Sequence, residues 1–556
     1  MKLKGSPLGS SDFAKIIREN RYYVDKTALV RRILEGNDIT LLCRPRRFGK
    51  TLNMQMLRCF FVLGENNAHL FEGLDISHDA ESMQHLGKYP VIYLSLKEVK
   101  LNDEAAAMWK MRSLLAHTWQ EFNYLAQHES TRDRYHQWTE RLNNENSLPH
   151  TFADSLKDLS ELLHEYHGAP VVILIDEYDT PVHSAWQHHY YEAMVSFLRQ
   201  MLGAALKDNV HLKKGVLTGI LRVSKESMFS DLNNFIVSTV LDNDIFSDQF
   251  GFTETEVLEM LQYFGLNGRE MAQLREWYDG YRFGQHTIYN PWSILNYIFS
   301  LDHALKPYWV NTSQDVLLRK LVFNDRSGIQ QQLQQLLDGE KVTVELDEHL
   351  TFGKLDYDQQ TVWTLLGMAG YLKIEHPQAE NTYDISITNK EVRKAFKEVI
   401  RDWITMDLKA YDHHRMLEAL LAGKIKDFEW ELAEFVLRVF SYHDTERRYT
   451  ENFYHAFFLG LLASLEHRYH LTSNREAGYG RYDICLTPKN PAEWGIVIEI
   501  KAPESDTNET IEDALAAAVT QLEQKKYDAA LAAAGVDKIL RVAIAVQGKA
   551  VKVKSV

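Results

Sequence analysis

Cysteine is scarce in this chain of 556 residues, which has only Cys43, Cys59 and Cys485. The three lie far apart in the sequence, so they form neither a zinc-spaced cluster nor a disulfide framework, and we expect a reducing, cytoplasmic setting. No apolar run approaches the roughly 20 residues that a membrane-spanning helix needs. The N-terminus, MKLKGSPLGSSDF, has no apolar signal segment. We therefore expect neither a secreted protein nor a membrane partner.

An excess of basic residues is also missing. The chain has 62 Lys and Arg against 77 Asp and Glu, a net charge of −15. Proteins that coat nucleic acid are usually basic. Nucleic acid binding would therefore need a local basic groove, and the alternative is that the chain binds no nucleic acid at all. Its length is too great for a single core, so we expect several domains.

The first half of the chain alternates short apolar runs with long amphipathic stretches. The runs are ITLLCR (39–44), VIYLSL (91–96), VVILID (171–176) and VLTGIL (216–221). Runs that are apolar almost throughout are typical of buried parallel strands, and the stretches between them suit crossover helices. Residues 1–250 are therefore predicted to form a three-layer α/β domain with a parallel sheet.

The second half changes character twice. Residues 251–435 are predicted to be mainly helical. Within them, about 358–405 has the order helix, strand, strand, helix, which is compatible with a winged helix and equally with a hairpin that joins two helices. Residues 436–556 return to an α/β pattern, with a helix at 451–467 and strands near 481–486, 495–501 and 541–546.

The stretch LLCRPRRFGKTLN lacks the first glycine of a phosphate-binding P-loop, whose pattern is G-x-x-x-x-G-K-[ST]. Arg44 stands in place of that glycine, and Pro45 follows, which has no backbone N–H to offer a phosphate. The end of the motif, Gly49-Lys50-Thr51, is intact. It lies between an apolar strand and a helical pattern, the setting in which backbone N–H groups and a helix N-terminus face phosphates. The alternatives are a decayed nucleotide site and a chance match.

The backbone N–H groups from Arg46 through Arg47, Phe48 and Gly49 to Thr51 remain available to a nucleotide. Lys50 is predicted to reach the β- and γ-phosphates, and Thr51 to hold Mg²⁺. The side chains of Arg44, Arg46 and Arg47 would add positive charge beside the phosphates. We therefore expect ATP binding.

A second buried run, VVILIDEYD, ends in carboxylates. Asp176 is predicted to bind the magnesium, and Glu177 to orient an attacking water. On a further strand, Thr218 is a candidate sensor of the γ-phosphate, with Arg222 shortly after it. The plain alternative is a strand that ends in ordinary solvated acids. The guanine-reading N-K-x-D pattern is absent, because the N-K pair at 389–390 continues as E-V, so ATP is favoured over GTP.

A separate constellation lies near the C-terminus, in GYGRYDICLTPKNPAEWGIVIEIKAP. Glu499 and Lys501 are two residues apart on a predicted strand and so point to the same face. If the strand that carries Asp483 pairs beside it, two carboxylates and an ammonium group converge. Two carboxylates can hold Mg²⁺, or Mn²⁺ in its place, and the lysine can stabilise charge on a phosphate. The alternative is an exposed, salt-bridged pair of strands.

Two helices flank this constellation. Glu451 begins the stretch ENFYHAFFLGLLASL and is a candidate third acid for the metal, although an acid in a first helical turn also simply favours the helix dipole. Downstream, IEDALAAAVTQLEQKKY carries Gln521, a candidate contact to the site or to a DNA backbone.

Taken together, these motifs resemble a known family. YYVDKTALVRRIL, CRPRRFGKTLN, VVILIDEYDTPV, LTGILRVSKES and WYDGYRFG followed by YNPWSILNYI are similar to the bacterial AAA-ATPase-like proteins. The C-terminal segment NREAGYGRYD, IEIK and the Q-x₅-Y helix motif resembles the PD-(D/E)XK nuclease domain that usually follows them, whose fold is the α/β fold of restriction endonucleases. The resemblance implies that RPRRFGKT is the normal P-loop of the family.

The resemblance also carries roles onto particular residues. It implies an ATP site made by Lys50, Thr51, Asp176 and Glu177, and a nuclease site made by Asp483, Glu499 and Lys501. Residues that match further family motifs are Gln521 and Tyr527 on the C-terminal helix, Tyr482 at the first position of the P-D pair, and Tyr22, Asp25 and Lys26 in a lead-in segment near the nucleotide.

Three functions are compatible with these motifs. The favoured one is an ATP-controlled, metal-dependent nuclease that acts on DNA in preference to RNA. The second is a nucleotide-dependent switch or scaffold whose nuclease-like domain binds nucleic acid or protein without cleaving. The third is a motor ATPase with a structural C-terminal domain, which would form an oligomer and use Arg222 as an arginine finger.

Overall fold

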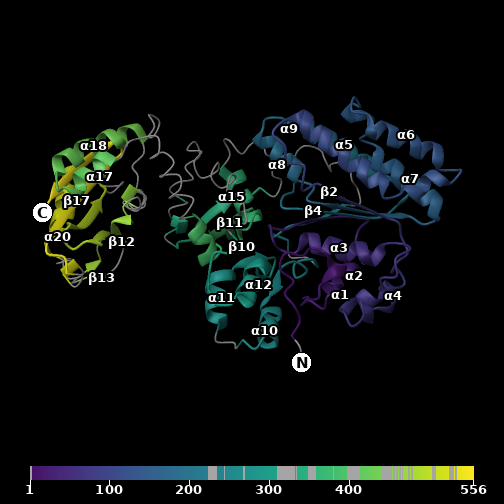
Figure 1. Ribbon diagram of the computed structural model, residues 1–556, viewed down its shortest axis with the longest axis horizontal. Helices are drawn as coiled ribbons and strands as arrows, with labels where there is room; N and C mark the ends of the chain where they lie inside the picture. Colours follow the sequence, from purple (N-terminus) through teal and green to yellow (C-terminus); the bar gives the residue numbers. More distant parts are fainter. Residues whose placement is uncertain are drawn as a thin grey trace. The chain divides into compact units, whose positions relative to one another are not determined.

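The structure is a computed structural model of the whole chain (Figure 1). The residues that it describes are 3–222, 235–242, 245–266, 270–309, 332, 335–337, 339–347, 359–379, 381–396, 414–439, 454, 458, 461–462, 465, 467–473, 476–477, 480–481, 483–503, 509–524, 531–532 and 535–556.

The chain forms two compact units. The first comprises residues 1–327 with 339–394, and the second comprises 328–338 with 395–556. The predicted fold class is confirmed: a P-loop-like α/β domain with a parallel sheet, a mainly helical middle and a C-terminal α/β domain follow one another along the chain. The domain boundaries given above stay predictions.

A five-stranded parallel sheet organises the N-terminal part, in the order β2-β3-β4-β1-β5. All side chains of β1 and β3 are buried, as their almost wholly apolar sequences predict. The strands are β1 (Ile39–Cys43), β2 (Val91–Ser95), β3 (Val171–Asp176), β4 (Leu212–Gly219) and β5 (Phe235–Ser238).

Helices cover both faces of this sheet (Figure 1), with α1 to α4 on one side and α5 to α9 on the other. This makes the predicted three-layer arrangement. The helices are α1 (Phe13–Arg18), α2 (Ala28–Glu35), α3 (Lys50–Phe61), α4 (Ala80–Met83), α5 (Glu104–Gln120), α6 (Arg132–Asn143), α7 (Ser155–His167), α8 (Thr180–Gln187) and α9 (Tyr191–Leu206), with short turns η1 (Ala68–Leu70), η2 (Asp75–His78), η3 (Asn123–Gln127) and η4 (Pro149–Thr151).

The middle of the chain belongs to the first unit over residues 251–327 and 339–394, where it combines helices with two small antiparallel sheets, β6-β8-β7 and β10-β11-β9. Its helix α10 starts with a capping box, in which Thr253 and Glu256 satisfy each other's backbone N–H groups. The elements are α10 (Glu254–Tyr263), α11 (Met271–Tyr278), α12 (Pro291–Phe299), α15 (Gln359–Met368), β6 (Phe252–Thr253), β7 (Tyr281–Phe283), β8 (His286–Tyr289), β9 (Val342–Glu345), β10 (Leu372–Ala379) and β11 (Thr382–Ile387).

The predicted order helix, strand, strand, helix is present here as α15, β10, β11 and a helical segment at 390–396. The strand β9, which sequence analysis did not predict, pairs with β11 and completes a three-stranded sheet.

The second unit is built on a mixed five-stranded sheet in the order β12-β15-β16-β17-β18. Apolar side chains of α17 and α18 pack on one face of this sheet, and those of α20 pack on the other. The elements are α17 (His414–Leu421), α18 (Ile425–Val439), α20 (Ile511–Gln524), β12 (Tyr469–Ser473), β13 (Glu476–Ala477), β14 (Gly480–Arg481), β15 (Ile484–Pro488), β16 (Gly495–Lys501), β17 (Ile539–Gln547) and β18 (Ala550–Ser555).

Within the described ranges, no helix has both the length and the apolar character that crossing a membrane would require.

Gly251 shows how closely the middle of the chain packs on the P-loop. Its φ is +78°, and an added Cβ would lie 2.3 Å from Ile288 Cγ2 and 2.8 Å from Phe48 Cδ1. Its N–H donates to the carbonyl of Phe48 at 3.1 Å. A side chain at this position would therefore force the two segments apart.

We expect Gly251→Ala to destabilise the protein by about 2–4 kcal/mol, from the left-handed backbone together with overpacking. The control is Gly265→Ala, since Gly265 has a similar φ of +76° but no atom within 4 Å of an added Cβ. That control should cost about 1 kcal/mol. Urea unfolding of both variants measures the difference, and equal losses would contradict the proposed packing.

Candidate functional site

The P-loop connects the buried strand β1 to helix α3. Gly49, with φ of +86°, lies immediately before the helix, so that Lys50 and Thr51 open its first turn. Only glycine adopts this backbone conformation without strain. The local sequence thus places the start of α3, with its unpaired N–H groups, at the carboxyl end of the central strand, where phosphate is favoured.

One carboxylate connects three of the predicted nucleotide residues. The hydroxyl of Thr51 donates to Asp176 Oδ2 at 2.7 Å, and that of Thr218 donates to Asp176 Oδ1 at 2.5 Å. Asp176 ends β3 and is fully buried. A carboxylate beside a P-loop threonine is the donor set that holds Mg²⁺ against a nucleotide.

Lys50 is also buried, and its ammonium group donates to the carbonyls of Arg44 and Pro45 at 2.9 and 2.8 Å. Burial lowers the pKa of Lys50, and the carboxylates of Glu177 and Asp179 act in the opposite direction. The Lys50 side chain is thus held across the loop by the backbone carbonyls at the start of the loop.

Glu177 has a backbone φ of +54°, which is rare for a residue with a side chain. Its N–H lies 3.4 Å from the hydroxyl of Thr218, and its carboxylate accepts from Thr180 at 3.2 Å. Strained backbone of this kind clusters at functional sites. The arrangement keeps the predicted water-orienting carboxylate next to Asp176.

Arg44 lies elsewhere than the sequence suggested. Its guanidinium is fully buried and donates to the carbonyl and hydroxyl of Ser238 at 2.9 and 2.8 Å. It also lies over the rings of Phe250 and Phe283, 5.4 and 5.2 Å from their centroids. Arg44 therefore connects β1 to β5 and to the middle of the chain. Its guanidinium does not point to the predicted phosphate site.

Three further loop residues, Arg46, Arg47 and Phe48, contact the middle of the chain. The Arg46 carbonyl accepts from the indole N–H of Trp309 at 3.2 Å. Arg47 is exposed, and its guanidinium lies 4.4 Å from the ring centroid of Trp292. Phe48 is buried, with its ring against Tyr281 and Phe283 of β7. Of these predicted residues, only Arg46 and Arg47 keep side chains that are not buried.

Sequence analysis missed Tyr178 and Asp179. Asp179 is buried and accepts from the N–H groups of Ile220 and Leu221 at 2.8 and 3.0 Å, while the Tyr178 hydroxyl donates to the Leu221 carbonyl at 2.7 Å. Burial raises the pKa of Asp179, and the two backbone hydrogen bonds lower it. Together they fix the turn that leads into Arg222. The last acid of DEYD was the available signal.

The lead-in segment contacts the loop before α10. The ammonium group of Lys26 lies 2.6 Å from a carboxylate oxygen of Glu256 and donates to the Asp248 carbonyl at 2.7 Å. Asp25 accepts from the N–H of Asp75, and the ring of Tyr22 packs against that of Tyr263. This segment therefore supports the 248–256 region, whose Gly251 contacts the P-loop.

The second candidate site lies at the junction of β15 and β16. Ile484 pairs with Ile498 in an antiparallel register, which places Asp483, one residue before β15, opposite Glu499. The Asp483 carboxylate accepts the N–H of Ile500 at 2.8 Å. The two predicted metal ligands therefore share a face of the sheet.

Lys501 completes this group. Its ammonium group lies 3.5 Å from Glu499 Oε1, and the Glu499 side chain is fully buried whereas 20% of the Lys501 side chain is exposed. Glu499 and Lys501 lie two and four residues after Val497 on β16, and so on the same face as Val497. Val497 packs on Ala518 and Leu522 of α20. Gln521 is half-buried on that helix, one turn after Ala518. Asp483, Glu499 and Lys501 therefore share the face of the sheet that α20 covers, and Gln521 lies on that helix.

The oxygen donors Asp483 and Glu499 suit a hard cation such as Mg²⁺. In the part of the chain that the structure describes, no group of three or more His, Cys, Asp or Glu side chains is placed to hold a metal. The predicted third acid, Glu451, lies outside the described residues, as do Tyr482 and Tyr527.

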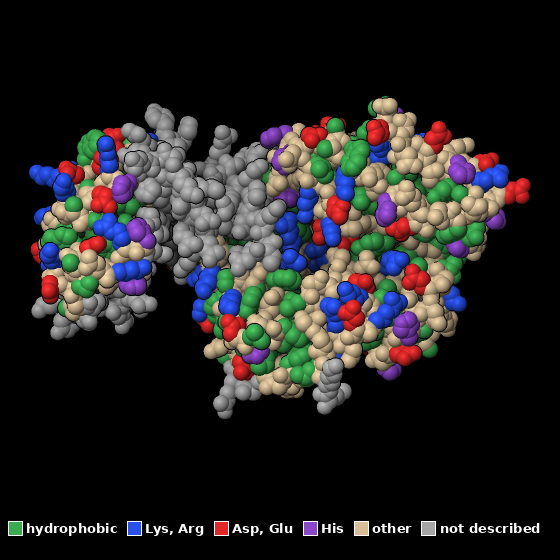
Figure 2. Space-filling view, viewed as in Figure 1, with side chains coloured by type: hydrophobic (Ala, Val, Ile, Leu, Met, Phe, Trp, Pro, Cys, Tyr) green, Lys and Arg blue, Asp and Glu red, His purple; other side chains and the backbone are tan. Residues whose placement is uncertain are grey.

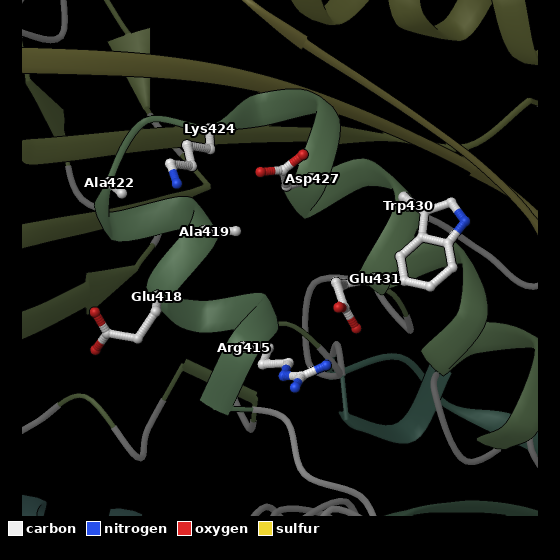
Figure 3. A pocket seen from close by; sticks show the side chains of 8 residues that line it. All are labelled: Arg415, Glu418, Ala419, Ala422, Lys424, Asp427, Trp430 and Glu431. Atoms are coloured by element: carbon white, nitrogen blue, oxygen red, sulfur yellow. The ribbon is translucent and has the colours of Figure 1, made fainter.

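A hollow of about 560 Å³ lies between α17 and α18 (Figure 3). It is on the face of the sheet opposite to Glu499, because α17 and α18 pack on the side of Ile498 and Ile500. Charges of both signs surround it, and it is not part of the predicted metal site. Its lining residues are Arg415, Glu418, Ala419, Ala422, Lys424, Asp427, Trp430 and Glu431.

The visible surface is mixed in charge. On the face shown in Figure 2, the described Lys and Arg side chains are interspersed with Asp and Glu. Such a surface is consistent with a chain of 62 Lys and Arg against 77 Asp and Glu.

Comparisons with known proteins identify two domains. The family model described as predicted AAA-ATPase matches residues 7–229, and that of the PD-(D/E)XK nuclease superfamily matches residues 449–556. The chain is 27% identical over 408 residues to the "Uncharacterized protein in vnfD 5'region" of Azotobacter chroococcum mcd 1. The aligned segment covers 72% of this chain and 70% of that protein.

A crystal structure of a Signal Transduction ATPase with Numerous Domains (STAND) protein with a tetratricopeptide repeat sensor, from Pyrococcus horikoshii, is 16% identical to this chain. The match covers 80% of this chain and 54% of that one, with a TM-score of 0.27. The chain spans about half the length of that protein.

Replacing Arg44 by the consensus glycine tests its structural role. We expect Arg44→Gly to destabilise the protein by about 2–4 kcal/mol, because the buried Ser238 groups and the two aromatic rings lose their partner. The control is Arg31→Ala, since the Arg31 side chain is 37% exposed and its ion pairs with Asp75 and Asp79 are 3.8 Å long. This variant should change stability by less than about 1 kcal/mol. Thermal or urea unfolding measures both, and an Arg44→Gly protein as stable as the wild type would contradict this role.

Proposed function

We propose that this chain, in which a predicted AAA-ATPase domain precedes a PD-(D/E)XK nuclease superfamily domain, binds and hydrolyses ATP and uses the nucleotide to control metal-dependent cleavage of DNA. The observation that carries the proposal is that both sites assemble in one chain. Asp176 connects Thr51 to Thr218, and Asp483 lies opposite Glu499 beside Lys501.

At the nucleotide site, each residue has a separate task. The N–H groups of residues 46–51 and the ammonium group of Lys50 bind phosphate oxygens. Thr51 and Asp176 would hold Mg²⁺. Glu177 orients the water that attacks the γ-phosphate, as its position beside Thr218 supports. Arg222 follows the turn fixed by Asp179 and would stabilise charge on the phosphate.

At the nuclease site, Asp483 and Glu499 would hold Mg²⁺ or Mn²⁺, which would supply a Lewis acid and a more acidic bound water. Lys501 provides a positive charge beside the buried carboxylate of Glu499, suited to position water or to stabilise a phosphate in the transition state. Gln521 on α20 contributes a contact to the site or to the DNA backbone.

The second candidate is a nucleotide-dependent switch whose C-terminal domain binds nucleic acid or protein without cleaving it. The observation that favours it is the net charge of −15, together with the mixed charge of the described surface in view. It predicts nucleotide binding without metal-dependent cleavage. A motor-type oligomer is a third arrangement, in which Arg222 would act on a neighbouring copy.

Cleavage of plasmid and linear DNA in Mg²⁺ or Mn²⁺ distinguishes these candidates. We expect Lys501→Ala to lower the cleavage rate by about 10²-fold or more while ATP binding persists, because the residue belongs to the proposed metal site and not to the proposed nucleotide site. Lys50→Ala should abolish ATP binding. The matched control is Lys489→Ala, an exposed lysine just after β15.

Cleavage by Lys501→Ala at the wild-type rate would remove the nuclease assignment from this site. ATP binding without cleavage by the wild type under any condition would favour the switch.

A further inference from the structure

We propose that Trp309 is a positioning residue for the nucleotide: its indole, with Glu391 behind it, holds the P-loop of residues 44–49 in the conformation that receives the phosphates. This inference rests on the proposed function, in that the loop is taken to bind ATP. It adds residues of the middle of the chain, more than 250 positions from the loop, to the nucleotide site.

The loop contains a conformation that needs support. Arg47 has a φ of +69°, in the left-handed region that residues with a Cβ disfavour by about 1–2 kcal/mol. Gly49 follows at +86°, where a glycine meets no such cost. A strained residue persists where surrounding groups determine its backbone. The backbone conformation of Arg47 therefore depends on the groups that surround it.

Contacts from the middle of the chain reach the residue on each side of Arg47 and Arg47 itself. Trp309 Nε1 donates to the Arg46 carbonyl at 3.2 Å. The Arg47 guanidinium lies over Trp292, and the ring of Phe48 is buried against β7. The hydrogen bond from Trp309 is the one that acts on the backbone immediately before the strained residue, and so it orients that peptide directly.

Trp309 is itself held rigidly. Its side chain is 1% exposed, and its ring lies 6.3 Å from that of Tyr281 and 5.1 Å from that of Tyr371. Its backbone N–H donates to Glu391 Oε1 at 2.6 Å, and the other Glu391 oxygen accepts from Ser293 at 2.8 Å. One buried carboxylate thereby connects α12 to the segment that carries Trp309.

A purely structural role for Trp309 predicts a different result from a positioning role. If the indole only fills the core, its loss changes stability and leaves the ATP affinity of the folded protein unchanged. If it orients the loop, removing the Nε1–H weakens nucleotide binding even where the fold is retained, because part of the binding energy is then spent on ordering the loop.

The test compares Trp309→Phe with Trp119→Phe in the full chain. Phenylalanine keeps most of the ring and removes the donor to Arg46. Trp119, on α5, is also fully buried, and its ring packs against Tyr135 and Trp138. Mg²⁺-ATP affinity is measured by titration calorimetry at a temperature where unfolding curves show each variant to be folded.

We expect the Kd for ATP to rise about 3- to 10-fold in Trp309→Phe, the range of one hydrogen bond, and to stay within about 2-fold of wild type in Trp119→Phe. An unchanged Kd in Trp309→Phe, with wild type binding ATP and Lys50→Ala not binding, overturns the inference and leaves the proposed function standing. If the wild type binds no ATP, the proposed nucleotide function fails first.

Should Trp309→Phe not fold, the same question is answered at Glu391. Glu391→Gln keeps an oxygen that accepts the Trp309 N–H, whereas Glu391→Met keeps the volume and removes the acceptor. We expect the Kd for ATP to rise in Glu391→Met by a similar factor and to remain near that of the wild type in Glu391→Gln. Equal Kd values in the two variants overturn the inference.

Discussion

The backbone turn of residues 46–49 is the constraint on which the nucleotide site depends. It reverses the chain between β1 and α3, so that Lys50 spans the loop and Thr51 reaches Asp176. The missing first glycine is accommodated because Arg44 turns into the core and binds Ser238 of the edge strand β5. The loop is therefore a variant that is tied both to the sheet and to the middle of the chain.

A similar constraint acts in the C-terminal unit, where strand register replaces loop geometry. The antiparallel pairing of β15 with β16 decides that Asp483 faces Glu499, and the two-residue period of β16 adds Lys501 to the same face. A shift of one residue would carry these side chains to the face covered by α17 and α18, where Ile498 and Ile500 now pack. Apolar packing on both faces of the sheet therefore fixes the register that holds Asp483, Glu499 and Lys501 together.

Much of this was predictable from sequence, for definite reasons. Strands β1 and β3 are apolar almost throughout, and β4 and β16 each contain a shorter apolar run. The P-loop ending follows β1, and the acid pair lies at the end of β3. The fold class was therefore predicted and is confirmed. Strands β5 and β9 were missed because they are four residues each, and part-buried or alternating strands of that length give little signal. The role of Arg44 was not foreseen because its partner, Ser238, lies 194 residues away. Trp309 and Glu391 were missed for the same reason, because they too lie far along the chain from the P-loop. The roles assigned to residues at the nucleotide site and at the nuclease site stay predictions.

The central claim is that one chain couples nucleotide state to cleavage, and the wild-type protein tests it most directly. Cleavage of a DNA substrate would be timed in Mg²⁺ alone, with ATP, with ADP and with a non-hydrolysable ATP analogue. The account predicts a cleavage rate that differs by about 10-fold or more between nucleotide states, the effect of a coupling energy of 1–3 kcal/mol. The same cleavage rate in all four conditions would contradict the coupling of the two sites.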